Sequence, residues 1–145
     1  MSTDVASGAV VGLYAQLHAL LDEIAEADLS ACSDVEIAAV AESHECAVRR
    51  MGFLGHAPIV EISDRDLYRR LGYRTLSNYL SAALRITSPK RRLDEMTALA
   101  RFCSPTGTCL EPQLPDLAAA QADGRVGAGH IHAVLDVLDQ IPAAI

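Results

Sequence analysis

The first half of the chain carries apolar residues at the three- and four-residue spacing of amphipathic helices. One stripe consists of Val10, Leu13, Leu17, Leu20, Leu21 and Ile24. A second follows Ser33 and Glu36, which have the spacing of a capping box, where each side chain bonds the other residue's backbone N–H. The spacing predicts long helices over residues 10–29 and 34–51, the second with a kinked extension where glycines and a proline interrupt the pattern.

Shorter helical segments follow, separated by turn-forming residues. The pattern predicts helices over residues 64–71, 75–85, 89–100, 115–123 and 128–140. Three prolines and a glycine predict a loop over residues 103–115. No strand pattern of sufficient length appears. We therefore expect an all-α domain with two long N-terminal amphipathic helices, shorter helices and a C-terminal helical hairpin, and more than about half of the residues in helices.

Composition and charge add an asymmetry to this picture. The chain of 145 residues is 50% hydrophobic but only 4% aromatic, so its core must be aliphatic. The length suits a single helical domain over residues 1–145, or the N-terminal part of one. The formal charge is −7, yet residues 1–48 hold nine acids and no base, whereas residues 49–101 hold eleven bases and five acids. This distribution indicates an acidic flank and a basic working surface.

The N-terminus and the cysteines bear on the compartment. The sequence begins without the positive region of a secretory signal, and no apolar run reaches the length of about 20 residues that a bilayer requires, so we expect a cytoplasmic protein and no membrane partner. Cys32, Cys46, Cys103 and Cys109 form no Cys-x-x-Cys pair and are expected to be free thiols. A zinc site built from two of these cysteines and a histidine is the less favoured alternative.

The helix that begins at Pro89 has cations in its first turn. Lys90, Arg91 and Arg92 lie where the helix dipole makes positive charge unfavourable by roughly 0.3–1 kcal/mol each. Such a cluster at a helix N-terminus is typical of a phosphate site. The alternative is a solvated face on which Lys90 pairs with Asp94 and Arg91 with Glu95, four residues along the helix.

The histidines and the C-terminal hairpin point less clearly to chemistry. His130 and His132 are two residues apart, so they cannot share a metal ion from one helix face. His44 lies on an apolar stripe and is expected to pack, partly buried. The hairpin over residues 115–140 has helix-turn-helix spacing, but two aspartates on its second helix favour packing over insertion into a DNA groove. We identify no catalytic motif, so we expect no enzyme activity, cofactor, metal or small-molecule ligand.

The sequence as a whole resembles a known family. The segments that carry the resemblance are LYAQLHALLDEIAEADLSACSDVEIAAVAESHECAVRRM, GYRTLSNYLSAALRITSPKRRLDEMTALARF and TGTCLEPQLPDLAAAQADGRVGAGHIHAVLDVLDQIP. They are similar to the N-terminal region of the actinobacterial 13E12 repeat family, which contains the domain of unknown function 222 and is often followed by an HNH endonuclease domain. The resemblance implies a helical DNA-associated domain of mobile-element proteins. We expect the chain to stop before any HNH motif, so no catalytic residue is carried over.

Two functional hypotheses follow. In the first, the chain is an accessory domain that binds the phosphate backbone of double-stranded DNA through Arg85, Lys90, Arg91, Arg92 and Arg101. In the second, the stripes of the first two helices pair with a second copy, and the chain is an oligomerisation module with no role in nucleic-acid binding.

Overall fold

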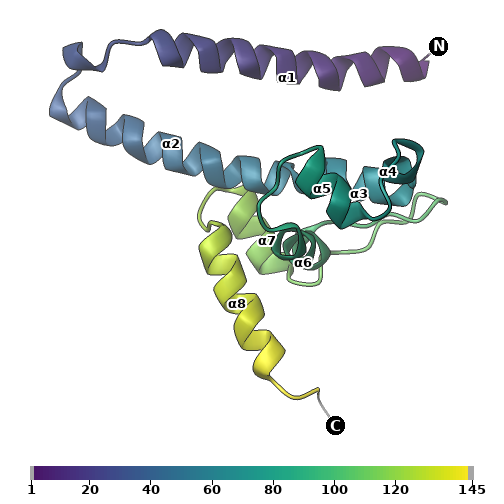
Figure 1. Cartoon of the computed structure of the whole chain (residues 1–145). Helices are drawn as coiled ribbons and strands as arrows, with labels where there is room; N and C mark the ends of the chain where they lie inside the picture. The colour runs from purple at the N-terminus through teal and green to yellow at the C-terminus, as the bar shows by residue number, and fades with distance from the viewer. Residues whose placement is uncertain (1, 144–145) are drawn as a thin grey trace. The chain divides into compact units, whose positions relative to one another are not determined.

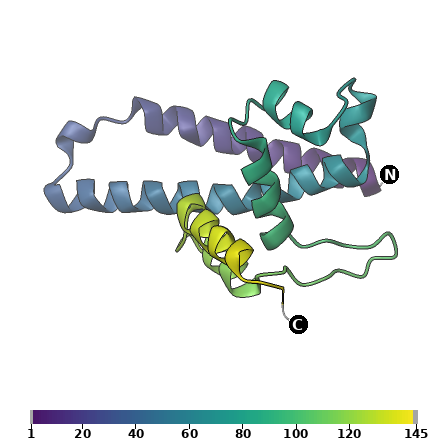
Figure 2. The ribbon, with the colours of Figure 1, turned by 60° about the horizontal axis from the view of Figure 1, so that its bottom comes forward.

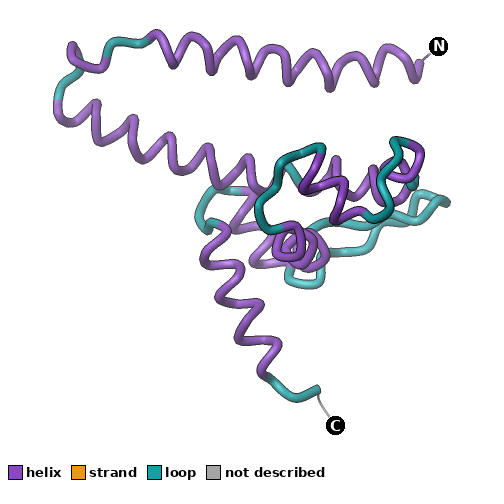
Figure 3. The backbone as a smooth tube through the Cα atoms, viewed as in Figure 1, coloured by secondary structure: helices purple, strands orange, loops and turns teal. Residues whose placement is uncertain are grey.

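The structure is a computed structural model that describes residues 2–143, with side chains from residue 8 onward. About 70% of the chain is helical, and the described residues contain no strand (Figure 3), which confirms the predicted all-α class. The chain divides into two compact units, Met1–Ala41 and Glu42–Ile145. None of the helices described combines the length and apolar character needed to cross a bilayer.

The first unit contains helix α1 (Ser2–Glu26), the short 3-10 helix η1 (Leu29–Ala31) and the start of α2 (Asp34–Leu54). The predicted capping box is confirmed, because the Ser33 N–H donates to Glu36 Oε2 at 2.8 Å and the Glu36 N–H donates to Ser33 Oγ at 3.2 Å.

The first predicted helix differs from α1 at both ends. It begins before residue 10, and it ends at Glu26 rather than near residue 29. The Asp28 side chain accepts a hydrogen bond from the Ser30 N–H at 3.0 Å and starts η1 there. This local cap takes the place of another turn of α-helix.

The second unit contains the later part of α2 and the shorter helices (Figure 1). These are α3 (His56–Asp64), α4 (Leu67–Arg70), α5 (Leu76–Ala82), α6 (Pro89–Leu99), α7 (Pro115–Ala122) and α8 (Ala128–Gln140). Each corresponds to a predicted segment, and the predicted kink lies at Gly55, between α2 and α3. Thr75 caps α5 as expected, through a 3.0 Å hydrogen bond from the Asn78 N–H to Thr75 Oγ1.

Helix α6 contributes to both apolar clusters of the second unit. Met96 packs with residues of α3 and α5, including Ile59 and Leu80, and Leu99 packs with residues of α7 and α8. The second cluster consists of Ala98, Leu99, Ala118 and Ile131. Helix α6 is therefore the element on which α3, α5, α7 and α8 pack.

Two expectations are wrong. Cys103 and Cys109 form a disulfide, whereas Cys32 and Cys46 are free. The loop folds back on itself and places the first two opposite each other in an antiparallel bridge, which the spacing alone does not reveal. His44 is exposed rather than partly buried, since no residue of α2 is buried in the described structure.

Gly124 allows the turn between α7 and α8 to approach α2 closely. Its φ of +78° is strained for any other residue, and a Cβ there would lie 2.9 Å from the Cys46 carbonyl oxygen. We expect Gly124→Ala to lower the free energy of unfolding by roughly 1–3 kcal/mol, measured by urea denaturation. The control is Gly129→Ala, where a Cβ meets nothing within 4 Å and stability should be unchanged or slightly higher. Equal stability of both variants would contradict this close approach.

Candidate site: a buried polar chain and the predicted cations

A carboxylate is buried where four helices of the second unit meet. Glu95 of α6 is only 4% exposed, and Gln121 of α7 is 1% exposed. Gln121 Nε2 donates to Glu95 Oε1 at 2.8 Å, and Nε2 of His132, on α8, lies 3.3 Å from Glu95 Oε2. Both carboxylate oxygens therefore have a polar neighbour, as a buried carboxyl group requires.

His56 of α3 completes this buried polar chain, which we define as His56, Gln121, Glu95 and His132. The Gln121 amide nitrogen is already directed to a carboxylate, so its oxygen must be the group that faces His56. His56 Nε2 lies 2.9 Å from that oxygen and must therefore carry the proton and donate. The polar chain joins α3, α7, α6 and α8.

The charge state of His56 follows from its burial. Desolvation lowers the pKa of His56 below its ordinary value of 6.5, and the nearby Arg92 cation lowers it further, whereas the hydrogen bond to Gln121 and the charge of Glu95 raise it. Desolvation is the largest of these influences, so His56 is neutral near pH 7. Its Nδ1 atom is buried without a hydrogen-bond partner in the described structure.

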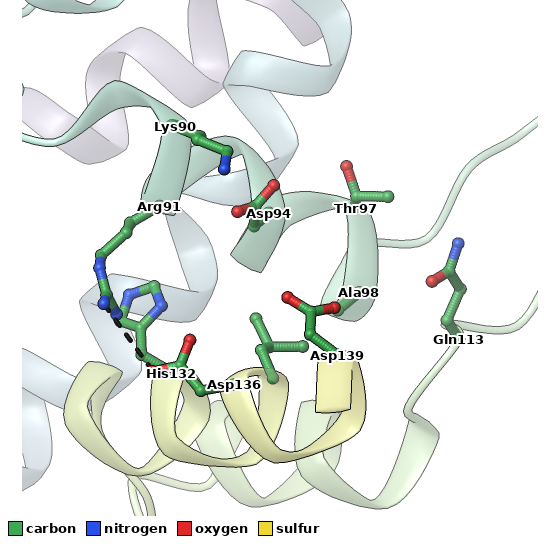
Figure 4. A pocket seen from close by; sticks show the side chains of 10 residues that line it. Lys90, Arg91, Asp94, Thr97, Ala98, Gln113, His132, Asp136 and Asp139 are labelled. Carbon is green, nitrogen blue, oxygen red and sulfur yellow. Dashed lines mark ion pairs between the residues drawn. The ribbon is translucent and has the colours of Figure 1, made fainter. Parts of the chain in front are cut away.

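Two of the predicted phosphate-binding residues line a hollow between α6 and α8. Lys90 and Arg91 lie along this hollow of about 440 Å³, together with three aspartates and His132 (Figure 4). Arg91 Nη2 is 3.8 Å from Asp136 Oδ2 of α8. The alternative in which Arg91 pairs with Glu95 is therefore wrong. Glu95 faces the interior and accepts a hydrogen bond from Gln121 instead.

The other predicted cations lie elsewhere. Arg92 is directed to the junction of α2 and α3, where a Cβ on Gly55 would collide with its guanidinium group, and its Nε is buried without a partner in the described part. Arg101 Nη2 lies 3.6 Å from Glu111 Oε1. Arg85 is exposed in the connection between α5 and α6, with a φ of 57°. The five predicted residues thus do not form one cluster.

Cations without a carboxylate partner lie along a longer basic segment of the sequence. Residues 65–92 hold eight cations and the single acid Asp66, a net charge of +7. Within the described residues, five exposed cations of this segment have no carboxylate within 4.0 Å: Arg69, Arg70, Arg74, Arg85 and Lys90. Three tyrosines lie in the same segment, and the Arg69 guanidinium lies 5.7 Å from the centre of the Tyr68 ring.

The C-terminal hairpin is used for packing. Ala118, Ala120 and Gln121 of α7 and Ile131 of α8 are buried against the unit. Among the side chains described, those of residues 8–143, no group of three or more His, Cys, Asp or Glu is placed to hold a metal ion. The sulfurs of Cys103 and Cys109 are bonded to each other, so they are not available as zinc ligands.

Comparison with known proteins identifies the family. The family described as a domain of unknown function (DUF222) matches residues 38–145. The chain belongs to this family. Uncharacterized protein Rv3466 of Mycobacterium tuberculosis is 33% identical over 127 residues, which cover 86% of this chain and 57% of that protein. Uncharacterized protein Mb1179c of Mycobacterium bovis is 31% identical over 130 residues, 88% of this chain and 28% of that protein.

The DUF222 chain thus spans about half the length of its first curated relatives, or less. No solved structure matches it. Sequence reasoning named His132 and Glu95 in other contexts but did not predict that they, His56 and Gln121 form a polar chain. Glu95 has the sequence spacing of a helix-surface ion pair, and no local pattern marks His56 or Gln121 as its neighbours.

The neutral state of His56 makes stability depend on pH. The unfolded chain takes up a proton near pH 6.5, whereas folded His56 resists protonation, so the free energy of unfolding must fall as the pH decreases below 6.5. We expect this contribution to reach up to about 1.4 kcal/mol per pH unit. Urea denaturation between pH 7.5 and 5 should show that the free energy of unfolding falls more steeply with decreasing pH for wild type than for His56→Gln. The exposed-histidine control His44→Gln should follow wild type, and parallel curves for wild type and His56→Gln would contradict the assignment.

Proposed function

We propose that this DUF222 chain is a DNA-associated accessory domain that binds the phosphate backbone of duplex DNA and has no catalytic residues of its own. The observation that carries the proposal is the set of unpaired, exposed cations in residues 65–92, within a chain whose net charge is −7. Cations that neutralise phosphates contribute affinity by releasing counterions, whatever the base sequence.

The pairing pattern distinguishes among the five residues singled out from the sequence. Arg85 and Lys90 have no carboxylate within 4.0 Å among the described residues, although Lys90 shares its hollow with three aspartates and Arg85 does not line it. Arg91 and Arg101 each have a carboxylate beside them, and that carboxylate would be brought close to the DNA as well. Arg92 is partly buried against the α2–α3 junction. Arg85 and Lys90 are therefore the stronger candidates.

The resemblance to 13E12 repeat proteins supports the same function. By that resemblance we propose that the chain belongs with mobile-element proteins in which an HNH endonuclease domain often follows this region, and the N-terminal sequence favours a cytoplasmic location. Any nuclease chemistry would then belong to that domain, and the helical region would hold the DNA.

Two charge-matched variants test the proposal. Arg85→Gln/Lys90→Gln and Arg91→Gln/Arg101→Gln each remove two exposed positive charges. We expect the first pair to weaken binding of a labelled duplex and to reduce the slope of log K against log salt by up to about 1.8, and the second pair to change the slope little. Fluorescence anisotropy across salt concentrations measures both, with far-UV circular dichroism as the control for folding.

Two results would contradict the proposal. One is an equal loss of duplex affinity for the two variants, which would mean that net charge alone determines binding. The other is no salt-dependent duplex binding by wild type. This second result would favour the rival hypothesis of self-association through the stripes of α1 and α2, which light scattering measures directly.

A further inference from the structure

We infer that the Cys103–Cys109 disulfide is a site of reversible thiol–disulfide exchange with a small dithiol, and that its state controls the order of the hairpin between α6 and α7. This inference is independent of the proposed function. Both cysteines are exposed, so an attacking thiolate reaches either sulfur without any opening of the helical core.

The disulfide lies in an exposed hairpin whose other contacts between residues 104 and 108 are local hydrogen bonds. The chain runs out and back between α6 and α7 as a long loop (Figure 2). Cys103 and Cys109 form an isolated antiparallel bridge rather than part of a sheet. Between the two cysteines, the Ser104 N–H donates to the Thr108 carbonyl at 2.7 Å. The Gly107 N–H donates to the Ser104 carbonyl and closes the turn. A two-stranded hairpin alone is marginally stable in water, so the covalent bond supplies much of its order.

The base of the hairpin is fixed separately. The Leu110 N–H donates to the Phe102 carbonyl at 2.8 Å, and Phe102 packs against the cluster that contains Met96. On the other side, the Leu114 N–H donates to the Ala98 carbonyl at 3.1 Å, which ties the start of α7 to α6. Opening the disulfide therefore releases residues 103–109 while leaving the helices packed.

The exchange is balanced within the protein and the dithiol. One thiolate of the dithiol attacks a sulfur of the pair and forms a mixed disulfide, and the other cysteine leaves as a thiolate, which then takes up a proton. The second thiolate of the dithiol displaces the protein sulfur, which also takes up a proton. The protein gains two electrons as the dithiol becomes a cyclic disulfide, and a disulfide oxidant reverses both steps.

Differential alkylation of the intact chain tests for exchange. Free thiols are first blocked under native conditions, the folded protein is treated with dithiothreitol, and new thiols are labelled with a heavy reagent and mapped by mass spectrometry. We expect the heavy label on Cys103 and Cys109. Cys32 and Cys46 should carry the first reagent, or, if they are shielded from it, their labelling should be the same with and without dithiothreitol. Absence of heavy label on the first two in the folded protein would overturn the proposal.

Hydrogen exchange then tests the effect on the hairpin. On reduction, the amides of Ser104 and Gly107 should exchange faster by on the order of tenfold or more, while amides of α6 and α7 keep their rates. The double variant Cys103→Ser/Cys109→Ser should match the reduced protein and fail to respond to oxidant, whereas wild type regains slow exchange. Unchanged hairpin rates on reduction would overturn control of order, and accelerated exchange throughout α6 would show a structural staple instead of a switch.

Discussion

The buried carboxylate of Glu95 is the constraint on which the packing of the second unit depends. A carboxylate that is 4% exposed is costly to bury unless polar groups approach both of its oxygens. Gln121 donates a hydrogen bond to Oε1, Nε2 of His132 lies 3.3 Å from Oε2, and His56 is in turn bonded to Gln121. Three other helices must therefore meet α6 in one arrangement. Loss of any one partner leaves a buried polar group unsatisfied, which costs far more than a surface contact.

The same helix divides its charges between interior and surface. The face that buries Glu95 also buries Met96 and Leu99, so the register of α6 is fixed by apolar and polar contacts together. That register directs Arg92 to the α2–α3 junction and leaves Lys90 and Arg91 along the hollow shared with α8. Three consecutive cations are thus divided between two surroundings. A continuous cationic surface from α6 alone is not formed, because the other unpaired cations lie on α4 and in the segments that precede and follow α5.

The sequence was sufficient for features whose partners are close along the chain. The Ser33–Glu36 box, the Thr75 cap and the glycine turns depend on residues a few positions apart, and the helices follow from local periodicity. The polar chain depends on partners 26 and 65 residues apart, and no local pattern selects them.

The disulfide and the surroundings of the cations show the same limit. The disulfide requires the loop to fold back on itself, and composition suggested only that a loop exists there. The position of Arg91 beside Asp136 depends on how α8 packs on α6, not on the spacing along either helix. Candidate residues could therefore be named from the sequence, but not their partners.

The most direct test of the central role of Glu95 is the protonation state of His56 in the folded protein. Long-range ¹H–¹⁵N correlation spectra of the histidine side chains at pH 7 report which ring nitrogen carries the proton. The arrangement of Gln121 between His56 and Glu95 predicts a neutral His56 ring protonated on Nε2. A ring protonated on Nδ1 alone, or a charged ring at pH 7, would contradict the hydrogen-bond order of the buried polar chain.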